Sequence, residues 1–293
     1  MLEAGTGRGD LPFQVRAEHR TGTRYLTAGR GFAMPNAGPG VPMRDAAYGV
    51  TTEADAREKV RELAAKKPDL IKIWVDDRNG TVEKLKPTLY RAIIDEAHAH
   101  GIRVMAHIAT LADAKDLLRA GVDGFGHCVR DKDVDDELVA MLRQRPTVFF
   151  LVTLWGERNG IAEKTESAER LLRNVAALHR AGVTIGLGTD TGGVTGGGDF
   201  GFASHMELEF LVRAGMSPAE AIAAGTRTAA RILGLDRVGT IAAGQSADFL
   251  VLDANPLDAI ANTRKIARVY LRGSEIDRST HWPSSPIARL VFR

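Results

Sequence analysis

Short apolar runs alternate with segments of helical periodicity along most of this 293-residue chain. The runs that we expect to form strands span residues 24–32, 70–77, 102–107, 122–129, 147–154 and 183–190. All of them are apolar enough to be buried on both faces, as parallel strands are. Strands that alternate with helices in this way predict an α/β fold built on a parallel sheet.

Helix-capping residues mark the segments between these runs. Thr110 is an N-cap signal, Asp113 follows three residues later as its capping-box partner, and Gly121 is the stop signal. Similar signals predict helices over 53–66, 87–100, 133–145 and 162–181. Ser204 and Ser217 each stand three residues before a glutamate, and this Ser-x-x-Glu pattern predicts the starts of two further helices.

The pattern changes near the C-terminus. Two strand-like runs, 246–253 and 266–273, have no long helix between them and predict a small β unit outside the α/β body. We therefore expect one domain over residues 1–235 and a C-terminal β portion over 236–293. The proline-containing tail from Ser279 is expected to dock on the surface or to be loose.

Composition excludes several classes of partner. The 39 basic and 37 acidic side chains nearly cancel, so no broad basic surface favours nucleic acid. No apolar run approaches the ~20 residues of a membrane span. Cys128 is the single cysteine, which excludes an internal disulfide. The expected partner is a small-molecule substrate; a homo-oligomer stays open. The cytoplasm is the default location, unless a leader sequence precedes this chain.

Two histidines stand at the ends of expected strands. His107 closes the run 102–107, and His127 lies near the end of 122–129, with a helix between them. A right-handed crossover makes such strands parallel and brings their carboxyl ends to one edge of the sheet. Catalytic groups of α/β folds gather at that edge, so two imidazoles there indicate a metal. Each histidine taken alone would also fit a core or solvent-facing position.

Lys72 lies in the middle of the apolar run 70–77 and is expected to be buried. A buried ammonium costs several kcal/mol unless it is paired, deprotonated or modified. A neutral lysine amine can add carbon dioxide, and the resulting carbamate is an anionic ligand able to bridge two cations. The alternative is an ion pair with a carboxylate such as Asp76.

Asp190 ends the run 183–190 and precedes the glycine-rich segment 191–199. A carboxylate at the carboxyl end of a barrel strand is typical of a functional site. The alternative is that Asp190 caps the segment that follows. The glycine-rich segment is not a phosphate-binding loop, because it lacks the Lys-Ser/Thr ending and does not lead directly into a helix.

At these four positions the chain resembles the metal-dependent amidohydrolase superfamily, in particular its imidazolonepropionase-like and prolidase-like branch. The resemblance covers nearly the whole sequence. Its marks are I-K-I-W-V around Lys72, the strand-end histidines His107 and His127, L-G-T-D ending at Asp190, and the stretch H-M-E-L-E-F-L-V-R-A-G-M-S-P-A-E-A-I. The closing G-T-I-A-A-G-Q-S-A-D-F-L-V-L-D-A-N-P-L resembles the return of that family into a β-sandwich. The fold that this implies is a TIM-type (β/α)8 barrel with a small C-terminal β-sandwich portion.

The resemblance also implies a ligand set and a mechanism. Lys72 would be the carboxylated bridging ligand, His107 and His127 would hold one metal, and Asp190 would bind the other. Zinc suits imidazole and carboxylate ligands. A metal-activated hydroxide would attack the carbonyl of an amide, a cyclic amide or a dipeptide-type substrate, and Asp190 would pass the proton to the departing nitrogen.

Two further residues are candidates for substrate binding. Arg130, three residues past His127, would pair with a substrate carboxylate; the alternative is a surface arginine paired with Asp131 or Asp133. His205, at the same expected edge, would contact the substrate or the leaving group. Its alternative is a surface histidine in the first turn of a helix.

One departure from the family changes the expectation. The family's strand-one motif His-x-His appears nowhere in this chain. We therefore expect an N-terminally truncated barrel with about six of the eight strands, holding no more than about one metal ion. Two other interpretations stay open: a catalytically inactive fragment, and a Schiff-base lyase with Lys72 as the nucleophile.

Overall fold

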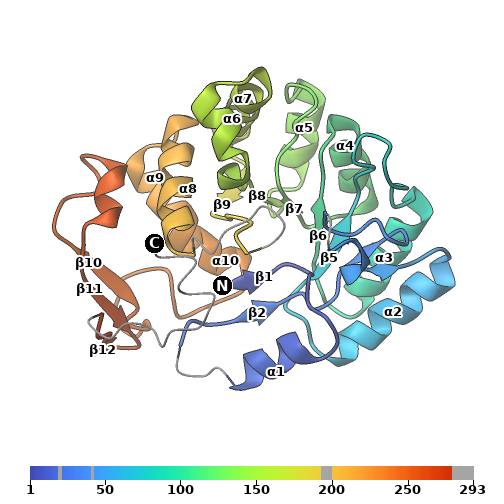
Figure 1. Ribbon diagram of the computed structural model, residues 1–293, viewed down its shortest axis with the longest axis horizontal. Helices are drawn as coiled ribbons and strands as arrows, with labels where there is room; N and C mark the ends of the chain where they lie inside the picture. The colour runs from blue at the N-terminus through green and yellow to red at the C-terminus, as the bar shows by residue number, and fades with distance from the viewer. Residues whose placement is uncertain (19–21, 41–42, 193–199, 279–293) are drawn as a thin grey trace. The chain divides into compact units, whose positions relative to one another are not determined.

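The computed structural model describes residues 1–18, 22–40, 43–192 and 200–278, and it contains two compact units (Figure 1). The first unit comprises Met1–Phe150 with Ala181–Val183, and the second comprises Leu151–Arg180 with Thr184–Arg293. Each is described below by itself. The domain boundary that the sequence places after residue 235 stays a prediction. No helix in the described part of the chain is long and apolar enough to cross a membrane.

A parallel sheet forms the centre of the first unit, as the sequence predicts. Its neighbouring strands follow in the order β4 (Tyr48–Gly49), β3 (Phe32–Ala33), β5 (Ile71–Trp74), β6 (Val104–His107) and β7 (Gly124–Gly126). Strand β8 (Phe149–Leu151) follows them in the sequence and ends where the second unit begins. Phe32, Ile73 and Phe125 are fully buried, because parallel strands covered by helices have no solvent-facing side.

Helices connect these strands in the βαβ pattern: α2 (Glu53–Ala65), α3 (Pro87–Ala99), α4 (Leu111–Ala120) and α5 (Asp136–Gln144). Helices α2 and α3 pack against each other (Figure 1). Thr110 caps α4 by accepting from the Asp113 amide, and Gly121 ends it at φ +98°, as expected. Helix α5 starts later than predicted, because Asp135 rather than Asp133 is its N-cap and accepts from the Leu138 amide.

The N-terminal region differs from the expectation of one strand over 24–32. That run forms two short strands, β2 (Leu26–Thr27) and β3, which are separated around Gly29 at φ +62°. An earlier strand, β1 (Leu2–Glu3), pairs with β2 in parallel. Two short helical segments, α1 (Leu11–Glu18) and η1 (Arg44–Ala46), complete this part of the unit.

The described part of the second unit carries strand β9 (Thr184–Gly186), seven helical segments before residue 233 and a small sheet. The helical segments are η2 (Leu154–Glu157), α6 (Arg158–Glu163), α7 (Glu166–Arg180), α8 (Phe202–Arg213), α9 (Pro218–Ala223) and α10 (Ala229–Ile232), the last two joined by the π-helical η3 (Ala224–Thr228). The sheet is antiparallel, in the order β10 (Phe249–Leu252), β11 (Ile266–Leu271) and β12 (Ser274–Glu275), with η4 (Ile260–Arg264) between its first two strands. The predicted C-terminal β unit is therefore confirmed; the tail from Ser279 lies outside the described residues.

The two Ser-x-x-Glu patterns have different outcomes. Ser217 forms a complete capping box with Glu220 at the start of α9, as predicted. The pattern at Ser204 is not a cap, because α8 begins earlier, after Gly201, and the carboxylate of Glu207 binds other backbone amides. The same four-residue signal thus marks a helix start only where the glutamate stays on the surface.

This difference predicts unequal effects of two alanine substitutions. Ser217→Ala should lower the free energy of unfolding by about 1 kcal/mol, because it removes the oxygen that accepts from the Glu220 amide. Ser204→Ala, the matched control, should change it by less than about 0.5 kcal/mol. Urea unfolding of both variants measures the two values, and equal losses would contradict the assignment of the caps.

Candidate active site

Three strand ends of the first unit are level with one another. In the register of the sheet Trp74 on β5 lies beside His107 on β6, and His107 lies beside Gly126 on β7. Lys72 is two residues before Trp74, so its side chain leaves β5 on the same face. The sheet therefore brings the end of β6 next to the lysine-bearing face of β5 and to the end of β7.

His127 has a backbone conformation that few residues adopt. Its φ is +109°, in a region that is costly for any residue with a Cβ atom. Regular alternation from Gly126 would turn the His127 side chain to the opposite face of the sheet. Instead its ring meets the ring of His107 edge-on, with centroids 4.6 Å apart and planes at 78°. The two imidazoles that the sequence places at one edge are in contact.

Both imidazoles are shifted toward the neutral form. Burial lowers the pKa of His107 to about 4, although the hydrogen bond that its ring donates to the Asp76 carboxylate opposes this shift. Burial also lowers the pKa of His127 well below its ordinary value, and the charges of His107, Lys72 and Arg130 act in the same direction. At neutral pH each ring therefore has a lone pair available, which is the form that ligates metals.

Lys72 is buried, as the sequence predicts, with 4% of its surface exposed. A Cβ atom added to Gly126 would lie 2.6 Å from its Nζ atom, so the amine rests against the backbone that leads directly into His127. A Cβ atom on Gly5 would lie 2.7 Å from the Lys72 Cβ atom. Because Gly5 and Gly126 have no side chains, they leave room for the Lys72 side chain and its amine.

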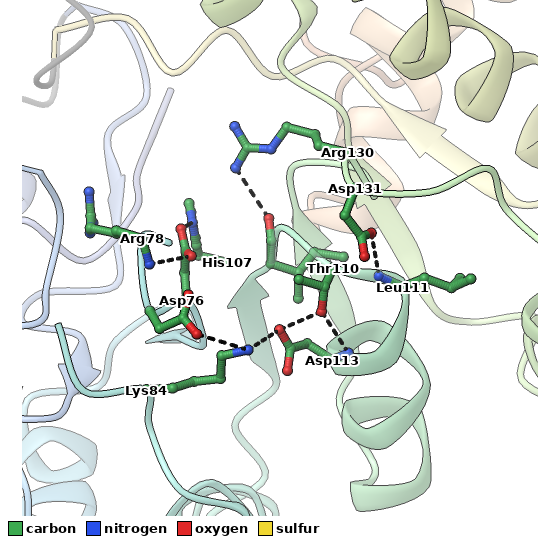
Figure 2. A network of polar contacts seen from close by, with 11 residues as sticks. Asp76, Arg78, Lys84, His107, Thr110, Leu111, Asp113, Arg130 and Asp131 are labelled. Carbon is green, nitrogen blue, oxygen red and sulfur yellow. Dashed lines mark hydrogen bonds and ion pairs between the residues drawn. The ribbon is translucent and has the colours of Figure 1, made fainter. Parts of the chain in front are cut away.

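Asp76 connects this group to the loop after β5. Its Oδ2 atom is 3.0 Å from His107 Nε2, and its Oδ1 atom accepts from the Arg78 amide at 2.8 Å (Figure 2). The hydrogen bond with His107 holds the pKa of the Asp76 carboxyl well below its usual range, although burial opposes this shift. The sequence suggested Asp76 only as a partner of Lys72, and its two contacts found here are with other residues.

Arg130 and Asp131 each contact a backbone group. Arg130 Nη2 donates to the Ile108 carbonyl at 3.3 Å, and Asp131 Oδ1 accepts from the Leu111 amide at the start of α4 at 2.8 Å (Figure 2). The charge of Arg130 lowers the pKa of both His107 and His127. The arginine that the sequence singled out therefore belongs to the same group of side chains.

Three potential metal ligands of the first unit lie together: His107, His127 and Lys72. Within the described residues, no three His, Cys, Asp or Glu side chains are grouped closely enough to hold a metal ion. The available donors are the two neutral imidazoles and the adjacent amine of Lys72. These residues fit a divalent cation if Lys72 carries a carbamate, which turns the amine into an anionic oxygen ligand.

Asp190 and His205 belong to the second unit. Asp190 lies four residues after β9, is exposed and has a φ of +53°; most of the glycine-rich segment that follows is outside the described residues. His205 Nδ1 is 3.0 Å from the Thr263 hydroxyl, and burial together with Arg264 lowers the pKa of its imidazole. The roles of both residues stay predictions.

Glu207 is a buried acid of the second unit whose role the sequence did not reveal. It is fully buried, and its two oxygens accept from the Leu154 and Trp155 amides at 2.9 and 2.7 Å. These amides begin η2, directly after Thr153 at φ +52°. A signal was present, because Ala203, Glu207 and Leu211 recur at four-residue spacing on the buried face of α8.

The buried carboxyl of Glu207 predicts a pH dependence of stability. Burial raises its pKa from the ordinary 4.5 to about 8, so the folded state retains a proton that the unfolded state has released. The stability contribution is complete below about pH 4.5 and is lost as the pH rises to about 8, by at most about 1.4 kcal/mol per pH unit. Glu207→Gln should remove this slope, which urea unfolding at several pH values measures. Glu163→Gln on α6 is the exposed control, and a slope that persists in Glu207→Gln would refute the assignment.

Comparisons with known proteins identify a family and several relatives. The model of the Amidohydrolase family matches residues 17–276. Ochratoxinase of Aspergillus niger is 29% identical over 200 residues, which are 63% of this chain but only 39% of the relative. A 5-methylthioadenosine/S-adenosylhomocysteine deaminase of Halalkalibacterium halodurans is 26% identical over 262 residues, 75% of this chain and 54% of the relative.

A solved structure is also similar over nearly the whole chain. The putative prolidase from Bifidobacterium longum superimposes with a TM-score of 0.77 and 31% identity, and the match covers 99% of this chain and 75% of that one. The chain spans about two fifths of the length of the ochratoxinase that it matches. The strand-end histidines, the buried lysine and the family match over residues 17–276 together identify the chain as a member of the Amidohydrolase family.

Proposed function

We propose that this chain forms the catalytic region of a metal-dependent hydrolase that cleaves carbon-nitrogen bonds of amides, cyclic amides or dipeptide-type compounds. The observation that carries the proposal is the contact between two neutral imidazoles at neighbouring strand ends, with a buried lysine amine beside them. The names of the relatives support the reaction class, since they include a deaminase and a putative prolidase. A (β/α)8 barrel over residues 1–235 and a β-sandwich portion from 236 belong to the same proposal.

The ligands would be carboxylated Lys72, His107, His127 and Asp190, holding one or two divalent cations, with zinc the expected ion. A cation held there would lower the pKa of a water molecule and polarise the substrate carbonyl. Asp76 already binds Nε2 of His107, so it would orient this imidazole and leave Nδ1 as the ligating atom. Carboxylate partners of this kind fix the ring and raise its basicity.

The other residues would bind the substrate and move the proton. Asp190 would take a proton from the attacking water and pass it to the departing nitrogen, which requires one carboxylate to act first as base and then as acid. Arg130 and His205 would contact the substrate. The alternative of a Schiff-base lyase uses Lys72 alone and gives no purpose to the contact between the two imidazoles, so we favour hydrolysis.

The ligand assignment predicts which substitutions remove metal. Protein prepared with zinc and bicarbonate should bind zinc, whereas Lys72→Ala and His127→Ala should lose most of it, as elemental analysis measures. Gly126→Ala should also lose metal, because its new methyl group would displace the Lys72 amine. Gly22→Ala is the matched control, since nothing lies within 4 Å of the added Cβ atom. Equal zinc in all five proteins would refute the site.

The proposed proton transfer predicts a selective loss of turnover in Asp190→Asn. Asparagine tolerates the left-handed backbone found at this position, so the fold should be unchanged. Because an amide cannot carry the proton, kcat should fall by ~10²–10⁴-fold while most of the zinc is retained. The assay is hydrolysis of N-acyl amino acids, dipeptides and cyclic amides by the zinc-loaded protein. A kcat within a few-fold of the unsubstituted enzyme would show that the proton takes another route.

A further inference from the structure

Three arginines surround the proposed reaction centre, one after each of three strands. Arg44 follows β3, Arg78 follows β5 and Arg130 follows β7. Parallel strands present their carboxyl ends at one edge, so the three loops meet at the edge where His107 lies. In Figure 2 the side chains of Arg78 and Arg130 lie on either side of His107. We call Arg44, Arg78 and Arg130 the arginine cluster.

Specific contacts hold two of these arginines in place. Arg78 Nη2 donates to the Gly38 carbonyl at 2.5 Å, and the Arg78 amide is bound by Asp76. The Gly38 amide in turn donates to the Arg44 carbonyl at 3.1 Å. Asp76 also binds His107, so one carboxylate fixes the Arg78 loop relative to the imidazole.

A fourth arginine, Arg30, binds the backbone directly after Arg44. The guanidinium of Arg30 donates to the carbonyls of Asp45, Ala46 and Ala47 at 2.9 to 3.1 Å, and it stacks over the Tyr48 ring at 4.7 Å. This network uses no part of the Arg44 side chain. The backbone of this loop is therefore held by hydrogen bonds that do not involve the Arg44 guanidinium.

Two members of the arginine cluster, Arg44 and Arg78, have a guanidinium nitrogen without a hydrogen-bond partner in the described part of the chain. In both residues this atom is Nε, and it is buried. Burial lowers the pKa of Arg78; Asp76 opposes this shift, and Arg44 and Arg130 add to it. Burying cations without a full set of acceptors is costly, so a cluster built only for stability would be expected to include more acids.

We propose that Arg44 and Arg78, together with Arg130, form an anion subsite that binds a free carboxylate of the substrate. The inference rests on the proposed function and narrows it to carbon-nitrogen compounds that carry a carboxylate near the scissile bond. Guanidinium groups suit this task, because their planar fork matches the two oxygens of a carboxylate. A neutral amide substrate would offer the positive charges of these guanidinium groups no opposite charge.

The test compares a carboxylate ligand with its neutral isostere. Isothermal titration of the full chain, freed of metal with EDTA so that metal-dependent turnover is off, gives the affinities of N-acetyl-L-alanine and N-acetyl-L-alaninamide. The unsubstituted protein should prefer the carboxylate by about 10–100-fold, the range expected for a hydrogen bond to a charged group. Arg78→Gln and Arg44→Gln should each reduce this preference at least several-fold. Arg78→Lys should retain part of it, since the charge stays but the fork is lost.

Arg143→Gln on the exposed surface of α5 is the matched control and should keep the full preference. Circular dichroism checks that each variant is folded. If Arg78→Gln is unfolded, Arg44→Gln serves as the test variant. Equal affinity for the two ligands, or a preference unchanged in both glutamine variants, would overturn the subsite. Inorganic phosphate that binds as tightly as N-acetyl-L-alanine and competes with it would identify a free-phosphate site and would also overturn the proposal.

The test of the anion subsite can be distinguished from the test of the proposed hydrolase activity. A carboxylate preference that depends on Arg78, in a chain that hydrolyses nothing when loaded with zinc, would support the subsite and refute the hydrolase. Hydrolysis of N-acetyl-L-alanine and its amide with equal kcat/KM would support the hydrolase and refute the subsite.

Discussion

The burial of Lys72 in a central strand is the constraint on which the rest of the candidate site depends. An amine in the middle of a parallel sheet is stable only where neighbours leave it space and change its chemistry. Gly5 and Gly126 leave the space for this side chain. Burial of the adjacent imidazoles lowers their own pKa values, and the charge of Lys72 adds to this shift.

Much of the secondary structure of both units could be predicted, because its signals are local. Periodicity identified the strands and helices, and the caps at Thr110 and Ser217 were correct because each involves residues within one turn. The direction of parallel strands predicted only that His107 and His127 would lie at one edge of the sheet. Their contact also requires the unusual backbone conformation of His127, which the sequence did not predict.

The features that the sequence did not reveal depend on long-range partners. Glu207 was interpreted as a cap for its own helix, but it binds amides more than fifty positions away in the sequence. Asp76 was considered only as a partner of Lys72, whereas it binds His107, which lies on the next strand. Both are acids with several suitable partners, and only the fold selects one. Patterns of spacing cannot make that selection, because they contain no tertiary distances.

Backbone strain gives a separate argument for where the chemistry lies. Residues with a side chain avoid positive φ, yet His127, Thr153 and Asp190 adopt φ values of +109°, +52° and +53°. Each follows the end of a successive strand, β7, β8 or β9, within four residues. Strain of this kind costs about 1–3 kcal/mol per residue and persists only where the surrounding structure enforces it. Its recurrence after three consecutive strands, once at a proposed ligand and once at the proposed proton carrier, is more easily explained by the placement of functional side chains than by the needs of folding.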